Sequence, residues 1–336
     1  MDYEEFLEEW NNDRPEVLVH TSGSTGEPKP LWVEKRRMEA SARMTIGFLG
    51  LKAGDTALLC MPLDYIASKM MVVHSIVGGM RLIAVPPSGH PMLSPPLPAD
   101  VGIDFAAMVP LQVYNSLSTP LEQQRLRRVR HLIIGGSAID SELEQRLRDF
   151  PNAVWSTYGM TETLSHIAMR RLNGPEATDA YCPLPGVTVG LDADDCLTIS
   201  APSLLGSQQS GGTLVTRDRA ELLADGTFRI LGRKDNVIIS GGLKLQAEAI
   251  ENALRPHLSA PFIVTRRPDS RLGQAVVLLT EGSAADAEAV CRRVLPRYWQ
   301  PRHYIAVGRI PQTPNGKPAR SEAEVMAGAG SADTGH

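Results

Sequence analysis

The stretch HTSGSTGEPKP, from His20 to Pro30, is the most informative part of this chain. It follows directly on the apolar run VLVH at 17–20, which reads as a buried strand. Gly23 and Gly26 let the backbone approach a ligand closely, and Lys29 supplies a positive charge. The hydroxyl side chains come from Thr21, Ser22, Ser24 and Thr25. This combination predicts a loop that holds phosphate oxygens.

The loop is not of the Walker A type, which requires GxxxxGK[ST] leading into a helix. Two residues separate Gly26 from Lys29, and Pro30 stands in the Ser/Thr position. The structural alternative is a flexible Ser/Gly linker. The apolar run that precedes the loop disfavours this alternative. The sequence therefore predicts a phosphate loop of another class.

Outward from this loop, short apolar runs alternate with longer helical patterns, which is typical of an α/β protein with buried strands. An amphipathic helix carrying Tyr3, Phe6, Leu7 and Trp10 opens the chain, and the proline-rich residues 86–98 form an extended loop. Strands are expected at 17–20, 56–61, 81–85, 105–109, 131–136 and 153–159, with helices near 34–48, 66–77 and 140–149.

The pattern changes near residue 186 to short strands separated by Asp and Gly turns, which indicates a small β subdomain. Beyond Asp235 the strands and helices suffice for a compact α+β domain. We therefore expect a catalytic domain that binds ATP and the acyl group at 1–233, a C-terminal domain at 234–325 and a disordered tail at 326–336.

Composition excludes several classes of protein. The 336 residues are 43% hydrophobic and 21% charged with a net charge of −4, which argues against a disordered chain and a general nucleic-acid binder. Cys60, Cys182, Cys196 and Cys291 lie too far apart for a zinc knuckle or a disulfide framework. The acidic N-terminus is unlike a secretory signal, and no stretch is apolar enough to span a membrane. A cytoplasmic protein is expected.

Five segments in order give the sequence a resemblance to the adenylate-forming superfamily of acyl- and aryl-CoA synthetases, luciferases and peptide-synthetase adenylation domains. They are TSGSTGEPK (21–29), STYGMTET (156–163), VTRDRAEL (215–222), GRKDNVIISGGLKLQAEAIE (232–251) and PQTPNGKPAR (311–320). In the third segment Arg217 replaces the family's usual glycine. The resemblance implies an α/β adenylate-forming-enzyme fold with an abbreviated N-terminal part, a β subdomain and a small mobile α+β C-terminal domain.

The resemblance also implies the chemistry. ATP converts a carboxylate to an acyl-adenylate with loss of pyrophosphate, and the thiol of CoA then displaces AMP. No nucleophile on the enzyme is needed, so catalysis rests on alignment and on neutralising charge. The implied catalytic residues are Lys317, Thr161 and Lys29. Glu162 would hold Mg²⁺.

Further residues acquire roles from the same resemblance. Asp235 would be the hinge about which the C-terminal domain rotates. CoA would meet Ser240, Gly241, Gly242 and Lys244. The implied nucleotide-binding residues are Thr21, Ser22, Gly23, Ser24, Thr25, Gly26, Gly135, Gly136, Ser137, Tyr158, Gly159, Asp218 and Arg233. Among them, Asp218 and Arg233 would bind the ribose hydroxyls.

Each of these roles has a structural alternative. Glu162 and Asp218 could be solvated loop carboxylates, and Tyr158 a half-buried core aromatic. Lys317 lies in PNGK, which by itself reads as a β-turn with an exposed lysine. Lysine is scarce in this arginine-rich chain, and the turn has the family's position, so we favour the catalytic role for Lys317.

Among adenylate-forming enzymes, the segments MPLDYIASKMMVV and YGMTETLSHIA are most similar to o-succinylbenzoate–CoA ligases of menaquinone biosynthesis. Relatives usually carry a further subdomain ahead of the phosphate loop, which we expect to be abbreviated here. Asp64 and Tyr65 replace an aromatic residue followed by histidine in the wider family, which leaves the details of the acyl pocket open.

The substrate would be a small carboxylic acid. o-Succinylbenzoate keeps a second carboxylate, which must be paired or hydrogen-bonded in a dry pocket. Lys69, His74 and His166 are the predicted substrate contacts, with Arg81 as a further cation, although a lone histidine such as His74 is more often a core residue. An aryl-acid ligase that loads a carrier protein and a nucleotide-binding pseudoenzyme are the alternatives.

Overall fold

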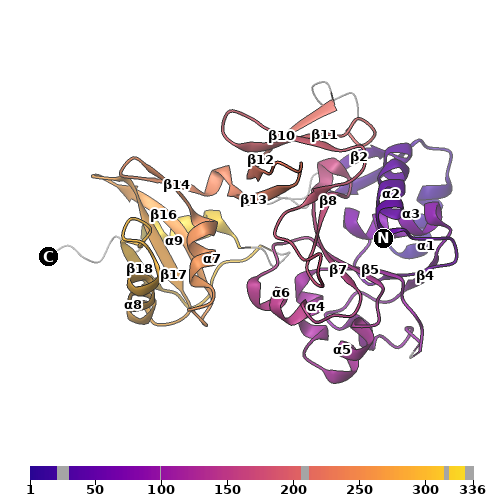
Figure 1. The fold of residues 1–336 in the computed structure, drawn as a ribbon, viewed down its shortest axis with the longest axis horizontal. Helices are drawn as coiled ribbons and strands as arrows, with labels where there is room; N and C mark the ends of the chain where they lie inside the picture. The colour runs from indigo at the N-terminus through magenta and orange to yellow at the C-terminus, as the bar shows by residue number, and fades with distance from the viewer. Residues whose placement is uncertain (21–29, 99, 206–211, 314–317, 330–336) are drawn as a thin grey trace. The chain divides into compact units, whose positions relative to one another are not determined.

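The computed structural model describes residues 1–20, 30–98, 100–205, 212–313 and 318–329. The chain forms two compact units, and many of their elements are labelled in Figure 1. The first unit comprises Met1–Gly190, Thr198–Val215 and Leu222–Arg229, and the second comprises Leu191–Leu197, Thr216–Glu221 and Ile230–His336. The division into a catalytic and a mobile domain after residue 233 concerns motion and stays a prediction.

The first unit is built on a seven-stranded sheet of order β4-β3-β5-β6-β7-β8-β9. The first five strands in this order are parallel, and β8 and β9 are antiparallel additions. All residues of the TALL and FAAM strands are buried, as expected where both faces of a parallel sheet are covered. The strands are β3 (Thr56–Leu59), β4 (Arg81–Ala84), β5 (Phe105–Met108), β6 (His131–Ile134), β7 (Ala153–Gly159), β8 (His166–Arg171) and β9 (Cys182–Pro183).

The helices of this unit begin and end at residues that favour those positions. Asp2 and Glu5 form a reciprocal capping box at the first helix. Gly50 and Gly79 end two longer helices in the left-handed conformation, with φ of 64° and 62°. The helices are α1 (Tyr3–Asn11), α2 (Lys35–Leu49), α3 (Ile66–Gly78), α4 (Pro110–Ser116), α5 (Pro120–Leu126) and α6 (Ser141–Leu147), with the short 3₁₀ turns η1 (Pro91–Leu93) and η2 (Thr161–Thr163).

The predicted strand at 17–20 belongs to a separate two-stranded sheet. It is β1 (Glu16–His20), which pairs antiparallel with β2 (Pro30–Glu34), a strand that the sequence did not predict. Pro30 stands opposite His20 in the register, so the two residues that flank the predicted phosphate loop are partners. A proline at the first residue of a strand is compatible with this pairing.

The predicted β subdomain is present as a four-stranded sheet of order β10-β11-β12-β13. Its residues are divided between the two units. The strands are β10 (Thr188–Leu191), β11 (Cys196–Ser200), β12 (Thr213–Leu222) and β13 (Phe228–Arg233).

The rest of the second unit is an α+β arrangement with two small cores. In β17, Val276 and Leu278 belong to one core, whereas Val277 and Leu279 belong to the other, because successive side chains of a strand point to opposite faces. The sheet order is β15-β14-β17-β16, and β18 also pairs with β17. Its elements are η4 (Lys234–Asn236), β14 (Val237–Ser240), β15 (Leu243–Gln246), α7 (Ala247–Leu254), β16 (Phe262–Asp269), β17 (Gly273–Thr280), α8 (Ala284–Val294), β18 (His303–Ala306) and α9 (Arg320–Ala329).

The last helix differs from the sequence prediction. The disordered tail was expected from residue 326, whereas α9 continues to Ala329. Ala323 and Ala327 are fully buried one turn apart and pack in the core with Ile263 and Val277, which explains why the helix extends this far. No helix in the described ranges is long and apolar enough to cross a membrane.

Candidate active site

Two of the predicted nucleotide-binding segments follow neighbouring strands of the main sheet. Gly135 and Gly136 come directly after β6, and Tyr158 and Gly159 end β7, its parallel partner. The carboxyl ends of parallel strands are where open α/β sheets bind ligands. A Cβ atom at Gly135 would lie 2.5 Å from Thr157 Oγ1, so any larger residue would force the Thr157 side chain to shift. Ser137 follows the two glycines as an exposed residue.

Tyr158 is half-buried in a cluster of aromatic rings. Its ring centroid lies 5.9 Å from that of Tyr181 and 5.5 Å from that of Phe228, both within the range of favourable aromatic pairs. The cluster holds the ring of Tyr158 at the carboxyl end of β7. Such a ring could lie against an adenine, and its role in nucleotide binding stays a prediction.

In the turn after β7, the neighbouring side chains of Thr161 and Glu162 differ in their exposure to solvent. The Thr161 side chain is buried, and the Glu162 side chain is exposed. Thr163 fixes the turn, because its hydroxyl accepts a hydrogen bond from the Met160 amide at 3.0 Å. Leu164 then takes a φ of 68°, which is rare for a residue with a side chain. The turn is thus held by hydrogen bonds, and it leaves the carboxylate of Glu162 exposed to solvent.

Glu162 fits a magnesium ion that arrives with ATP. Mg²⁺ is usually held by one or two carboxylates together with substrate phosphates and waters. Among the described residues no three His, Cys, Asp or Glu side chains gather as a metal site of their own. One exposed carboxylate beside a bound triphosphate would suffice, and the ion would neutralise phosphate charge there.

The centre of the predicted phosphate site lies outside the described residues. These unplaced residues are Thr21, Ser22, Gly23, Ser24, Thr25, Gly26, Lys29 and Lys317. Their roles stay predictions.

His74 and His166 form a stacked pair in the interior of the first unit. Their ring centroids lie 6.3 Å apart with an interplanar angle of 19°, and Phe105 meets His74 edge-on at 5.7 Å. The nitrogens of His166 are engaged, since Nε2 lies 3.0 Å from Thr45 Oγ1 and Nδ1 lies 3.2 Å from Ser165 Oγ. Within the described part of the chain, neither ring nitrogen of His74 forms a hydrogen bond of normal geometry.

Burial keeps both rings neutral. It lowers the pKa of His74 to about 3, an effect that His166 reinforces and that contact with the Met70 carbonyl partly opposes. Burial likewise lowers the pKa of His166 to about 4. The pair would therefore interact with a ligand through hydrogen bonds and not through a positive charge.

Lys69, the third predicted substrate contact, is engaged within the protein. Its ammonium donates to the Leu18 carbonyl at 2.5 Å, lies 3.8 Å from Glu9 Oε2 and sits over the Phe6 ring at 5.4 Å. Burial lowers its pKa, and Glu9 acts in the opposite direction. These contacts join α3 to α1 and β1, and they give Lys69 a structural role whatever else it binds. Arg81 is exposed and donates to Thr56 Oγ1 at 3.2 Å.

In the second unit, Asp218 and Arg233 are neighbours. Arg233 Nη1 lies 3.6 Å from Asp218 Oδ1. Arg233 also reaches Asp235 Oδ2 at 3.5 Å, and Arg217 lies 3.2 Å from the other oxygen of that carboxylate. The predicted ribose-binding pair and the predicted hinge therefore share one group of charges.

The predicted CoA-binding residues form a tight hairpin between β14 and β15. Ser240 pairs with Leu243, so Gly241 and Gly242 are its two loop residues. Their φ angles of 57° and 82° are both positive, as a type I′ turn requires. The Gly241 amide donates to the Leu272 carbonyl at 2.9 Å, and Lys244 is exposed on β15. An exposed glycine backbone beside a lysine suits an anionic ligand.

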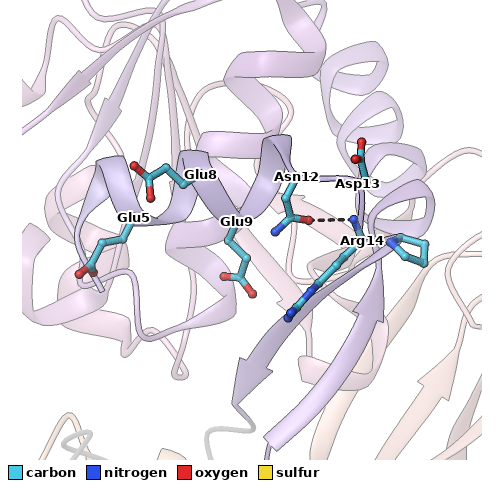
Figure 2. Close-up of a pocket in the computed structure, with 7 residues that line it drawn as sticks. Glu5, Glu8, Glu9, Asn12, Asp13 and Arg14 are labelled. Atoms are coloured by element: carbon cyan, nitrogen blue, oxygen red, sulfur yellow. Dashed lines mark hydrogen bonds between the residues drawn. The ribbon is translucent and has the colours of Figure 1, made fainter.

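A surface pocket along α1 contains none of the predicted site residues (Figure 2). Four carboxylates line it, so it would repel ATP, CoA and a carboxylate substrate. In Figure 2 the Asn12 side chain accepts a hydrogen bond from the Arg14 amide at 2.9 Å. The lining residues are Glu5, Glu8, Glu9, Asn12, Asp13, Arg14 and Pro15.

Several residues that support the site were not predicted. Thr45 holds His166, and its position in α2 carries a signal: Met38, Ser41, Ala42, Thr45 and Leu49 recur at helical spacing on the buried face. A polar side chain on such a face needs a partner. Tyr181 and Phe228, which flank Tyr158, offered no comparable signal because they lie far from it in the sequence.

Comparison with known proteins agrees with these observations. A family model described as AMP-binding enzyme matches residues 3–197. A 2-succinylbenzoate–CoA ligase of Bacillus thuringiensis subsp. konkukian is 26% identical, over a match that covers 94% of this chain and 70% of that protein.

Solved structures of adenylate-forming enzymes resemble this chain in fold. The acyl-CoA synthetase (AMP-forming)/AMP-acid ligase II-like protein from Dyadobacter fermentans is 33% identical with a TM-score of 0.64, covering 96% of this chain and 92% of that one. The o-succinylbenzoate coenzyme A synthetase from Bacillus subtilis, in complex with ATP and magnesium, has a TM-score of 0.73 at 22% identity, covering 91% and 69%. The chain belongs to the AMP-binding enzymes of the adenylate-forming superfamily.

Proposed function

We propose that this AMP-forming acid–CoA ligase activates o-succinylbenzoate as its acyl-adenylate and transfers the acyl group to CoA. The observation that carries the proposal is His74, a fully buried imidazole whose two ring nitrogens form no hydrogen bond of normal geometry with the described residues. Buried polar groups without partners are uncommon, and a substrate group could supply the missing partner. The likeness to 2-succinylbenzoate–CoA ligases supports the choice of acid.

In this proposal the two histidines have different tasks. His166 is fixed by Thr45 and Ser165, and its ring supports that of His74. His74 would donate one ring N–H to an oxygen at the far end of the acid. A neutral donor can bind a carboxylate or a ketone, and o-succinylbenzoate has both. A fatty acid has its one carboxylate at the reacting end and no oxygen at the far end, so it would leave the imidazole unsatisfied.

The phosphate chemistry would use the other predicted residues. Lys29 and its hydroxyl-rich loop would hold the β- and γ-phosphates, and Glu162 would hold Mg²⁺. Thr161 would bind the α-phosphate, and Lys317 would place its ammonium between the attacking carboxylate and that phosphate. Magnesium would supply neutralisation of charge, and the residues would align the reacting groups.

A panel of carboxylic acids tests the proposal. With ATP and Mg²⁺, pyrophosphate release should be fastest with o-succinylbenzoate, and added CoA should yield its thioester. Equal kcat/KM for benzoate or octanoate would reject the choice of acid while leaving the reaction class in place. Thioester formation only on a carrier protein would favour the alternative ligase, and no release with any acid would favour a pseudoenzyme.

His74→Leu refines the same test. It should raise KM for o-succinylbenzoate more than KM for benzoate, which has no distal oxygen. His257→Leu, at an exposed histidine in the second unit, is the matched control. Equal losses for both acids would assign His74 to packing alone.

A further inference from the structure

Arg217 is a charged residue where the family's usual residue is glycine, and the structure shows what its side chain contacts. Its guanidinium lies 3.2 Å from Asp235 Oδ1, so a residue of β12 is paired with the predicted hinge in η4. Both side chains are substantially exposed, at 63% and 45%. The pair joins two positions that are separate motifs in the sequence.

The guanidinium of Arg233 lies between two carboxylates and forms only a long contact with each of them. It is 3.6 Å from Asp218 Oδ1 and 3.5 Å from Asp235 Oδ2, both near the upper limit for an ion pair. The Arg217–Asp235 pair is shorter, at 3.2 Å. Asp235 is thus held more closely by Arg217 than by Arg233.

The backbone around this charge group is held in place. The Arg233 amide donates to Glu248 Oε1 at 3.2 Å, and its carbonyl accepts from Gln246 Nε2 at 2.9 Å. The Asp235 carbonyl accepts from Arg266 Nη1 at 3.2 Å. With the main chain fixed on both sides, the Arg233 side chain is the part that can change partner.

We propose that Arg217 is a positioning residue that holds the carboxylate of Asp235 so that Arg233 stays available to the ribose of the nucleotide. The inference rests on the proposed function, together with the role that the resemblance implies for Asp218 and Arg233 as the residues that bind the ribose hydroxyls. Asp235 and the nucleotide then compete for one guanidinium, and Arg217 sets the outcome. Release of AMP is thereby coupled to the side chain of the hinge residue.

The competition makes a directional prediction for AMP binding. Arg217→Ala leaves Asp235 with Arg233 as its guanidinium partner, so AMP should bind about two- to fivefold more weakly, the scale of one exposed ion pair. Arg217→Lys keeps a cation and should recover much of the affinity. Asp235→Asn removes the competitor and should tighten AMP binding. Because exposed charges are screened, these differences should shrink at high salt.

A double-mutant cycle separates competition from a general change in charge. In the Asp235→Asn background, Arg217→Ala should have no further effect on the dissociation constant of AMP, measured by calorimetry on the full chain. Arg292→Ala is the control, because this substitution removes one positive charge at a residue that pairs with Glu288 on α8. Thermal unfolding checks that each variant is folded.

The outcomes are distinct. An equal effect of Arg217→Ala in both backgrounds, or no effect in either, overturns the inference while wild-type pyrophosphate release keeps the proposed function. A wild-type protein that neither binds AMP nor releases pyrophosphate overturns both.

Discussion

The two histidines of the first unit and the charged side chains around Asp235 in the second unit differ in burial and in the kind of contact that holds them. His74 and His166 are almost entirely buried and neutral, and they are held by rings and hydroxyls. Asp235, Arg217 and Arg233 are about half exposed and are held by ion pairs. Buried neutral contacts fix one geometry, whereas screened ion pairs exchange partners at little cost. The comparison teaches that the buried contacts proposed to select the acid leave little freedom, while the side chains around the proposed hinge are joined by ion pairs that can exchange partners.

The largest expected effect tests whether the first unit carries the phosphate chemistry. Glu162→Ala and Lys29→Ala should each lower adenylation about 100-fold or more, the scale for losing one preorganised electrostatic group. Pyrophosphate exchange measures this step. Glu176→Ala is the matched control, since Glu176 is an exposed carboxylate whose partner is Arg171. Wild-type rates in both site variants would assign Glu162 and Lys29 to structure.

The next test asks whether the second unit separates the two half-reactions. Lys317→Ala should lose adenylation yet still convert supplied acyl-adenylate to thioester. Asp235→Pro should do the reverse, because proline fixes φ near −65° and restricts Lys234. If folded variants lose both half-reactions equally, the hinge has no special role.

A smaller effect concerns pH and the buried imidazoles. An unfolded histidine has a pKa near 6.5, whereas burial lowers the pKa of His74 to about 3 and that of His166 to about 4. Below pH 6.5 the unfolded chain therefore binds more protons at these two positions than the folded chain, and their contribution to stability falls as pH drops toward 4. Each histidine should contribute a slope of about 1.4 kcal/mol per pH unit.

Urea unfolding of the full chain between pH 7 and pH 4.5 measures this slope. His74→Leu should remove one histidine's share of it, and His257→Leu, at an exposed histidine, is the control. An unaltered slope in His74→Leu would mean that this ring is not held neutral by the fold.

The smallest effect is expected at Lys234, beside the hinge. Its ammonium lies 2.6 Å from Asp194 Oδ2, but both side chains are about half exposed. Such pairs contribute little to stability because water and salt screen them. Lys234→Ala should leave the unfolding temperature almost unchanged. A large fall in the unfolding temperature would show that ion pairs near the predicted hinge stabilise the unit. The proposed difference between these ion pairs and the imidazole pair would then be wrong.

The sequence predicted the parallel strands well because their signals are local. The buried runs at 56–61, 105–109 and 131–136 each contain an observed strand, and the helix expected near 66–77 is α3. The order of the motifs predicted the family, and the family model confirms it. These features need no knowledge of which distant segments meet.

What the sequence missed depends on such meetings. The strand β2 begins at Pro30, a residue that argues against a strand until its partner β1 is known. The bond from Thr45 to His166 spans 121 positions, and the pairing of Arg217 with Asp235 joins two separate motifs. The roles predicted for Lys29 and Lys317 stay predictions, because both lie outside the described residues.

The two-faced strand β17 has a consequence for how this protein can vary in length. Val276 and Leu278 serve one core while Val277 and Leu279 serve the other, so deleting a single residue would exchange the side chains of both cores at once. Insertions and deletions during evolution should therefore be excluded from 273–280 and accumulate in the turn at 270–272. A library of single-codon deletions across this hairpin, sorted for soluble protein, would map that boundary residue by residue.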